Sequence, residues 1–177
     1  PYVKVAEENT IPYYTWEDIF KYGKHDATIR WSRIIEEQKG FIAVDDSVKK
    51  IRKLKARSTS PFSVIAPSIE WVKENCIVSK EGEEWLKKLP GPYTLIFKLK
   101  KECIAKSANP GLKTLGVRIP KHWISKIIAE ANVPFVTTSV NKSGEDYMTS
   151  LEDLDASIKS GVDFLLYEGQ KSGNPSK

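Results

Sequence analysis

The sequence predicts an α/β fold with a single twisted, mixed, open sheet and flanking helices. The first observation behind this prediction is that short apolar runs, rich in Val, Ile and Phe, alternate with segments whose apolar residues recur at helical spacing. The second is that Pro and Gly residues separate these segments. The 177 residues suffice for one compact domain, or for one domain with an extension.

Strands and helices alternate in the predicted order of elements. The strands are short apolar runs, expected over residues 41–44, 62–66, 94–99, 115–119, 134–138 and 162–167. The helices have apolar residues on one face, and we expect them over residues 27–39, 47–54, 69–73, 81–88, 122–131 and 151–159. Helix boundaries are predicted where a residue can cap or stop a helix. In chain order these residues are Gly40 after the first helix, Asp45 or Asp46 before the second, Ser68 before the third, and Thr149 or Ser150 before the last.

Residues 1–27 are interpreted as an N-terminal extension, and residues 28–177 as the domain. The extension is rich in Tyr, Trp and Phe but shows no long period, so we expect it to pack on the domain through its aromatic side chains. Its one local signal is Thr15, which acidic residues follow, and this predicts a capped helical turn. The chain begins with Pro1, and we expect its start to be processed or incomplete.

The composition indicates a globular protein and excludes several classes. No apolar run approaches the roughly 20 residues that a membrane span needs, and the first residues lack the apolar core of a signal peptide. We therefore expect a cytoplasmic protein that does not associate with a membrane. Cys76 and Cys103 form no CxxC pattern and no metal spacing with His25 or His122. Reduced structural thiols are expected, and no metal site.

Two polar pairs share one spacing. Ser139 and Asn141 follow the strand over 134–138, and in an extended chain both side chains point to the same side. Lys55 and Arg57 leave the helix over 47–54 with the same spacing. Open α/β sheets bind ligands at the carboxyl ends of their strands, so we expect both pairs to face one nucleotide site.

Each pair also has a structural interpretation. Lys55 and Arg57 could continue a solvated basic face, because they end a run of Lys and Arg that begins at Lys49. Ser139 and Asn141 could be ordinary turn formers. A net charge of +5 is compatible with a nucleotide or RNA partner, but equally with a lysine-rich surface. Neither GxxxxGK[ST] nor GxGxxG occurs, so a Walker loop and a Rossmann cofactor are not indicated.

Five segments in order connect these pairs to a known family. They are Lys55-Ala-Arg57 with the following Ser-Pro-Phe-Ser-Val-Ile, then Pro90-Gly-Pro-Tyr-Thr94, Leu115-Gly-Val-Arg-Ile-Pro120, Pro134-Phe-Val-Thr-Thr-Ser-Val-Asn-Lys-Ser-Gly144, and Asp163 to Gly169 with Gly173-Asn-Pro-Ser176. Together they resemble the YrdC-like family of threonylcarbamoyl-AMP synthases, whose signature is a KxR pair followed by an SxN pair. The resemblance covers about residues 31–177.

The resemblance implies a YrdC-like sheet with a large, positively charged cavity on one side. It also implies an enzyme that joins L-threonine, bicarbonate and ATP into threonylcarbamoyl-adenylate and releases pyrophosphate. A downstream threonylcarbamoyl transferase then moves the group to adenosine-37 of tRNA. A magnesium ion is compatible with the triphosphate, although no carboxylate cluster in the sequence predicts one.

The resemblance also assigns roles to residues. Lys55 and Arg57 would line the cavity as catalytic and ATP-binding residues, which suits a reaction that brings two anions together. Ser139 and Asn141 would bind the ATP phosphates or ribose. The residues expected to bind threonine are Arg118, Thr137 and Ser176, with Thr138 and Ser143 as weaker candidates beside the SxN pair. Arg118 could alternatively be an ordinary surface residue of its strand.

Two departures from the family leave the activity open. The family's Pro-Thr-Asp-Thr-x-Tyr-Gly-Leu segment, which helps to bind threonine and nucleotide, is absent near residues 43–44, and the final strand beyond Ser176 is missing. Either the sequence omits residues at these loops, or the deletion is real. A real deletion would favour a nucleotide- or RNA-binding module without synthase activity. A third alternative is a relative that handles carbamoyl-adenylate in hydrogenase maturation, although such domains normally belong to a much larger chain.

Overall fold

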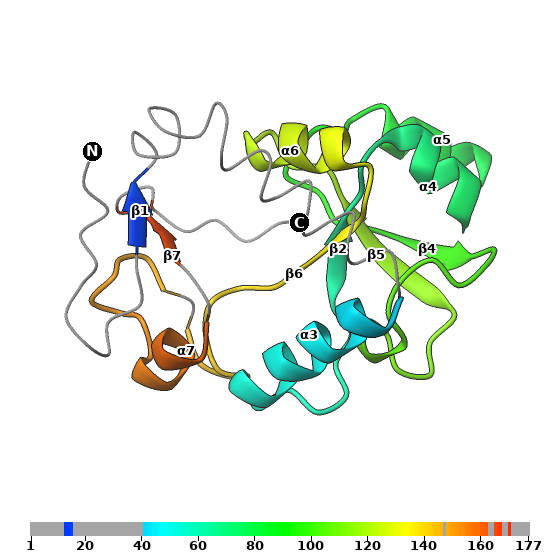
Figure 1. Cartoon of the computed structure of the whole chain (residues 1–177). Helices are drawn as coiled ribbons and strands as arrows, with labels where there is room; N and C mark the ends of the chain where they lie inside the picture. The colour runs from blue at the N-terminus through cyan, green and yellow to red at the C-terminus, as the bar shows by residue number, and fades with distance from the viewer. Residues whose placement is uncertain (1–12, 16–40, 147, 163–164, 168–169, 171–177) are drawn as a thin grey trace. The chain divides into compact units, whose positions relative to one another are not determined.

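Five strands form a mixed sheet in the computed structural model, which describes residues 13–15, 41–146, 148–162, 165–167 and 170 (Figure 1). The described residues fall into two compact units. The sheet unit comprises residues 41–52 and 58–138, and the loop unit comprises residues 13–15, 53–57 and the described part of 139–173. None of the helices in the described part of the chain is long and apolar enough to cross a membrane.

The order of strands in the sheet is β3-β4-β5-β2-β6. Their bounds are Ser63–Ile65 for β2, Cys76–Ile77 for β3, Leu95–Leu99 for β4, Thr114–Arg118 for β5 and Phe135–Thr137 for β6. Strands β2 and β5 are parallel, whereas the other neighbours are antiparallel. The predicted mixed, open sheet is therefore confirmed. Among the five strands of this sheet, only β3 had no predicted counterpart, because two residues are too short for an alternation pattern.

The strand register separates an apolar face from a polar face. Val64 of β2 lies opposite Val117 of β5 and Val136 of β6, all on one face. Ser63, one residue earlier, lies opposite Gly116 and Thr137 on the other face. The polar face is the one that carries candidate ligand-binding side chains.

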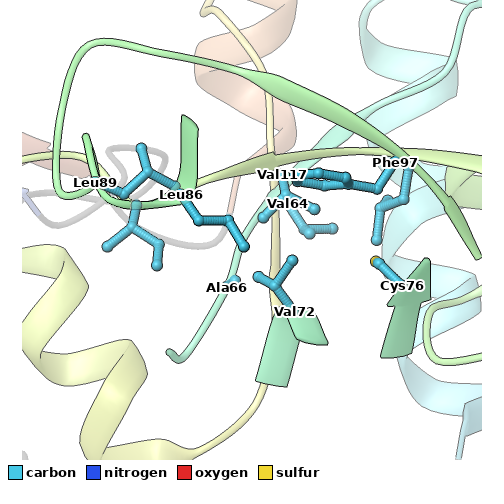
Figure 2. Packing of buried hydrophobic residues seen from close by; sticks show 10 residues of the cluster. Val64, Ala66, Val72, Cys76, Leu86, Leu89, Phe97 and Val117 are labelled. Carbon is cyan, nitrogen blue, oxygen red and sulfur yellow. The ribbon is translucent and has the colours of Figure 1, made fainter. Parts of the chain in front are cut away.

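Helices α4 (Ile69–Asn75) and α5 (Lys80–Leu86) supply the core against the apolar face (Figure 2). Val72 of α4 and Leu86 of α5 are buried in one cluster with side chains from the sheet. Each helix begins at a serine whose hydroxyl accepts a backbone N–H, as at Ser68, whose Oγ accepts from Trp71 N at 3.1 Å. The cap that the sequence predicts at Ser68 is confirmed.

Helix α3 (Phe41–Leu54) corrects the prediction for its region. The sequence predicts a strand over 41–44 and a helix only after Asp45 or Asp46, but one helix covers the whole range. A four-residue apolar run does not distinguish a strand from the first turn of a helix. Asp45 has a different partner, because its carboxylate accepts from Ser107 N at 2.9 Å. Val48 of α3 packs in a second buried cluster with Phe62, Ala105 and Ala108.

The remaining helix of the sheet unit is α6 (Ile124–Ala131), which lies within the predicted range and buries Ile128. A short 3₁₀ helix, η1 (Lys106–Ala108), lies in the predicted loop after β4.

The loop unit contains a parallel strand pair and one helix. Strand β1 (Tyr13–Thr15) pairs with β7 (Leu165–Tyr167), so Thr15 is the last residue of a strand, and the helical turn predicted after it lies outside the described residues. Helix α7 (Ala156–Gly161) starts at Asp155, whose carboxylate accepts from Ser157 N and Ile158 N.

The helix start predicted at Thr149 or Ser150 is wrong. Both residues instead donate backbone N–H groups to the carboxylate of Asp153, at 3.2 Å and 3.3 Å, in the turn before α7. The helix predicted over 27–39 lies outside the described residues, as does most of the extension over 1–27.

Candidate functional site

Lys55 is the residue around which the SxN segment is arranged. It follows the last residue of α3, and the residue is 4% exposed. Its Nζ donates to the carbonyl oxygen of Ser139 at 2.6 Å, to Oδ1 of Asn141 at 3.1 Å, and also to the carbonyl oxygen of Asn141. An ammonium group has three N–H donors, so all of them have acceptors in the SxN segment. The lysine of the KxR pair and both residues of the SxN pair are thus brought together.

The SxN segment is itself held in one conformation by short contacts. The Ser139 hydroxyl donates to Oδ1 of Asn141 at 2.5 Å, and Nδ2 of Asn141 donates to the carbonyl oxygen of Glu145 at 2.5 Å. Ser143 N donates to the carbonyl oxygen of Lys55 at 2.9 Å. Gly144 has φ of 90°, which favours glycine at this turn. The resulting loop presents a hydroxyl and an amide beside a buried cation.

Backbone geometry adds to the case for a functional site at the KxR pair. Ala56, between the two cations, has φ of 48°. A residue with a Cβ pays roughly 1–2 kcal/mol in this left-handed region. Strain of this kind gathers at ligand sites, where surrounding contacts enforce it. Ala56 N donates to the carbonyl oxygen of Lys53 at 3.2 Å, so the same left-handed conformation closes the C-terminal end of α3.

The electrostatics of the site follow from burial and from like charge. Burial lowers the pKa of the Lys55 ammonium, and the positive charge of the half-buried Arg57 lowers it further. Two cations separated by one residue concentrate positive charge just after the end of α3. Such a concentration attracts anions, including phosphates.

Arg118 and Thr137 lie in the sheet unit, on its polar face. Arg118 is the last residue of β5 and lies opposite Ile65, whereas Thr137 is the last residue of β6 and lies opposite Ser63. Two strand spacings and two residues along β2 separate their Cα atoms by roughly 12 Å. The Thr137 hydroxyl is 3.4 Å from Oγ of Ser63.

The Arg118 side chain has an unused donor. Its Nε is buried and has no hydrogen-bond partner among the residues that the structure describes. Buried donors are rarely left without an acceptor, so a ligand oxygen at this position would satisfy the group. Ser176, the remaining residue expected to bind threonine, lies outside the described residues, as does the end of the last motif.

Two of the family-like motifs pack directly on one another in the sheet unit. Gly91 N, in the Pro-Gly-Pro segment, donates to the carbonyl oxygen of Ile119 at 2.9 Å. A Cβ at Gly91 would come within 2.6 Å of the carbonyl oxygen of Lys88, so only glycine fits there. A Cβ at Gly116 would lie 3.4 Å from the Thr94 side chain. These contacts hold the end of β5, which carries Arg118.

An ion pair that no pattern in the sequence predicts connects the SxN loop to α7. Lys142 Nζ lies 2.8 Å from Oδ2 of Asp155, the residue that caps α7. Lys142 and the hydroxyl of Ser157 hold the pKa of Asp155 well below its usual range. Lys142 is a neighbour of Asn141 in the chain, but its partner is too far along the sequence for a helical or turn spacing to reveal it.

The described residues include no group of three or more His, Cys, Asp or Glu side chains that could hold a metal ion. Cys76 and Cys103 are both free, in agreement with the predicted thiols.

Comparison with known proteins identifies the family. The Sua5_yciO_yrdC family profile, described as "Telomere recombination", matches residues 42–177. The chain belongs to the Sua5/YciO/YrdC family. The resemblance that the KxR and SxN pairs suggested is therefore confirmed.

Curated relatives of the chain include synthases and an uncharacterized protein. Threonylcarbamoyl-AMP synthase of Bacillus subtilis is 32% identical over 126 residues, which are 67% of this chain and 36% of that protein. A putative threonylcarbamoyl-AMP synthase of Methanocaldococcus jannaschii is 30% identical over 138 residues, 75% of this chain and 63% of that protein. The uncharacterized protein YciO of Escherichia coli is 29% identical over 89 residues, 49% of this chain and 43% of that protein. The chain spans less than two thirds of the length of each of these relatives.

Solved structures of family members share the fold. The P. abyssi Sua5 complexed with L-threonine matches 71% of this chain and 38% of its own, with TM-score 0.60 and 27% identity. Full-length HypF in the phosphate- and nucleotide-bound form matches 71% of this chain and 20% of its own, with TM-score 0.62 and 34% identity. E. coli YciO matches 74% of this chain and 66% of its own, with TM-score 0.62 and 21% identity, which concerns the fold alone.

Proposed function

We propose that this chain makes threonylcarbamoyl-AMP from L-threonine, bicarbonate and ATP and releases pyrophosphate. The observation that carries the proposal is the contact between Lys55 and the Ser139–Asn141 segment, which joins the two signature pairs of the family. The synthases of B. subtilis and M. jannaschii, the latter putative, support it at about 30% identity. The product would pass to a threonylcarbamoyl transferase that modifies adenosine-37 of tRNA.

The proposed reaction needs positive charge more than acid–base chemistry. The threonine amine adds to bicarbonate, which gives a carbamate and water. A carbamate oxygen then attacks the α-phosphorus of ATP, and the bond to the departing pyrophosphate breaks. Nucleophile, phosphorus centre and leaving group all carry negative charge, so cations that neutralise and align them lower the barrier.

The roles of individual residues in this proposal are those that the family resemblance implies. Lys55 and Arg57 supply the charge, and the hydroxyl of Ser139 and amide of Asn141 hydrogen-bond the nucleotide. Arg118 offers its unused donor to the threonine carboxylate, with Thr137 and Ser176 as further contacts. Magnesium would arrive with the triphosphate as part of the substrate.

The test is pyrophosphate release from ATP, measured with and without L-threonine and bicarbonate. Release that requires both co-substrates, and that is lost in Lys55→Ala and Arg57→Ala, is the expected result. Lys53→Ala is the matched control, because Lys53 is an exposed cation two residues before Lys55. ATP hydrolysis that is indifferent to threonine would overturn the proposal.

A nucleotide- or RNA-binding module without synthase activity is the second candidate. The observation in its favour is that α3 runs unbroken from Phe41 to Leu54 and leads directly into Lys55. The family's threonine-binding segment is expected in that region and is absent.

The charges of α3 weaken the RNA form of this candidate. Lys49 pairs with Asp45 at 2.9 Å and with Asp46 at 3.3 Å, and Lys55 is buried. The basic run therefore presents fewer unneutralised cations to solvent than its sequence suggests. RNA affinity that falls steeply with salt would favour this candidate, since phosphate contacts release counterions. A flat salt response would count against it.

A further inference from the structure

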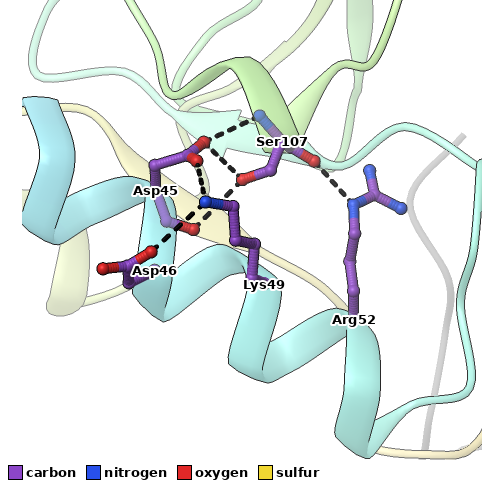
Figure 3. Close-up of polar contacts among 5 residues, drawn as sticks. All are labelled: Asp45, Asp46, Lys49, Arg52 and Ser107. Atoms are coloured by element: carbon purple, nitrogen blue, oxygen red, sulfur yellow. Dashed lines mark hydrogen bonds and ion pairs between the residues drawn. The ribbon is translucent and has the colours of Figure 1, made fainter.

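The guanidinium of Arg52 contacts four backbone carbonyl groups within the sheet unit, and Figure 3 shows the one to Ser107. Its Nε donates to the carbonyl oxygen of Ser107 at 2.6 Å. Nη1 donates to the carbonyl oxygens of Ser58 at 3.3 Å and Ser60 at 3.1 Å. Nη2 donates to the carbonyl oxygen of Ala108 at 3.3 Å. Arg52, one of the cations in the run of Lys and Arg that begins at Lys49, is therefore directed at the backbone.

Packing fixes the orientation of the guanidinium. Its central carbon lies 4.6 Å from the centre of the Phe62 ring, which is within range of a cation–π contact. Phe62 is buried and immediately precedes β2. The Arg52 side chain therefore rests on a rigid part of the core.

Ser107, one of the residues that Arg52 contacts, is also bound by Asp45 of α3. Ser107 N and Oγ donate to Oδ1 of Asp45 at 2.9 Å and 2.6 Å (Figure 3). Lys49 and these Ser107 contacts hold the pKa of the Asp45 carboxyl well below its usual range. Asp45 thus binds the N–H and hydroxyl of Ser107 while Arg52 binds its carbonyl group, and together they fix α3 against η1.

Arg52 and Ser58, which it contacts, lie at the two ends of the short segment that carries the KxR pair. Residues 53–57, which carry the KxR pair, leave the sheet unit after Arg52 and return to it at Ser58. Arg52 is bonded to the carbonyl groups of the returning chain at Ser58 and Ser60. We propose that Arg52 is a positioning residue that closes the KxR loop at its base and thereby fixes Lys55 and Arg57. The effect of Arg52 on nucleotide binding rests on the function proposed above.

Arginine suits this role better than lysine. A guanidinium has five N–H donors in a planar fork, whereas an ammonium is a point charge with three donors. The four acceptors of Arg52 lie on two separate segments, 58–60 and 107–108, so an ammonium in its place would reach only some of them. Arg52→Lys should therefore restore the loop in part, and Arg52→Ala should release it.

The accessibility of Lys55 reports directly on the loop. Lys55 is the buried lysine among the described residues, so an amine-acetylating reagent should modify it slowly in the native protein. In Arg52→Ala we expect acetylation of Lys55, followed by peptide mass spectrometry, to be about tenfold faster. Arg52→Lys should give an intermediate rate. Ser58→Ala is the matched control, because it keeps the carbonyl acceptor and should leave the rate unchanged.

Hydrogen exchange separates loop positioning from a general loss of stability. We expect exchange of the β2 and β5 amides to stay the same in Arg52→Ala while Lys55 becomes reactive. An unchanged Lys55 rate in a folded Arg52→Ala protein would overturn the proposal, as would faster exchange of β2 and β5 in step with Lys55. If Arg52→Ala does not fold, the same comparison between Arg52→Lys and the native protein decides.

A second readout keeps this inference distinct from the proposed function. Calorimetric ATP binding, measured without threonine, should weaken about tenfold in Arg52→Ala and less in Arg52→Lys. If the native protein binds no ATP, the proposed function fails, while the acetylation result still decides whether Arg52 holds the loop. Native ATP affinity in Arg52→Ala with an exposed Lys55 would contradict the positioning role.

Discussion

At the scale of single residues, Lys55 carries a charge into a place where the residue is 4% exposed. Desolvation of the ammonium costs free energy, which the oxygens of Ser139 and Asn141 offset. The same contacts leave two backbone carbonyl groups and one amide dependent on a single side chain. Lys55 therefore both supplies charge and holds the SxN loop in shape.

Replacing the ammonium alone separates these two roles. Lys55→Met keeps most of the apolar stem but leaves the acceptors of the SxN segment without their donor, so we expect a loss of about 1–3 kcal/mol in the free energy of unfolding. The measurement is urea unfolding without ligand. Lys53→Met, at an exposed position, should change the free energy by less than about 0.5 kcal/mol. Equal stabilities of the two variants would show that Lys55 does not hold the loop.

The site residues were predictable only in part. The KxR and SxN pairs could be found because each has a regular spacing in the sequence. The sequence did not reveal that Lys55 donates mainly to backbone oxygens, because every residue offers a carbonyl group. The interaction of Asp45 with Ser107 was also missed. The sequence suggests a helix cap for Asp45, and no spacing connects it to a serine 62 residues away.

At the scale of elements, α7 packs closely against Leu54, the residue before Lys55. Gly161, the last residue of α7, lies so close to Leu54 that a Cβ would meet Cδ2 of Leu54 at 2.2 Å and Cδ1 at 2.9 Å. Glycine at this position therefore serves close packing. The contact also lies next to the KxR pair in the chain.

Gly161→Ala should destabilise the protein through overpacking, by about 1–3 kcal/mol. Thermal or urea unfolding measures the change. The neighbouring Ser160→Ala is the control, because Ser160 is exposed and its replacement should cost less than about 0.5 kcal/mol. A Gly161→Ala protein as stable as the control would mean that Leu54 moves aside without cost.

Element types were predicted well where the pattern was long, and poorly where it was short. Strands β4 and β5 and helix α6 follow clear alternation or helical spacing, and the structure confirms them. The four residues 41–44 are apolar in either conformation, so the helical continuity of α3 decided their state. The start of α7 was misplaced because several residues near it can cap, and Asp155 does so.

At the scale of the whole molecule, stability depends on the core between the sheet and helices α4 and α5. Cys76 is buried in this core, and Cys103 packs against it. Burial raises the pKa of the Cys103 thiol to about 11, and the neighbouring Cys76 adds to the shift. The ordinary value for a cysteine is 9.0.

The raised pKa predicts a loss of stability at alkaline pH. Below pH 9.0 the thiol is protonated in both states, so its contribution is fully present. As the pH rises toward about 11, the unfolded chain releases the proton and the folded protein retains it, so the free energy of unfolding falls. Cys103→Ala should show a shallower fall over this range than the native protein in urea unfolding. If the free energy of unfolding fell equally steeply with pH in both proteins, the Cys103 thiol would not be the cause of the loss.

The family was predictable from the sequence because five short motifs occur in order, although none is specific alone. The activity was not predictable in the same way. The family's Pro-Thr-Asp-Thr-x-Tyr-Gly-Leu segment is absent near residues 43–44, so the residues expected to bind threonine there have no counterpart in this sequence. Ser176 lies outside the described residues, and its role in binding threonine stays a prediction. The same holds for the cavity, for magnesium and for the extension over 1–27.

Formation of the adenylate itself tests the central claim most directly. The protein is incubated with ATP, L-threonine and ¹³C-bicarbonate, and the product is isolated and weighed by mass spectrometry. We predict threonylcarbamoyl-AMP that carries the label only when all three substrates are present, with formation about 100-fold slower in Lys55→Ala and unchanged in Lys53→Ala. Binding of ATP by the native protein without any labelled adenylate would contradict the account and leave a nucleotide-binding module in its place.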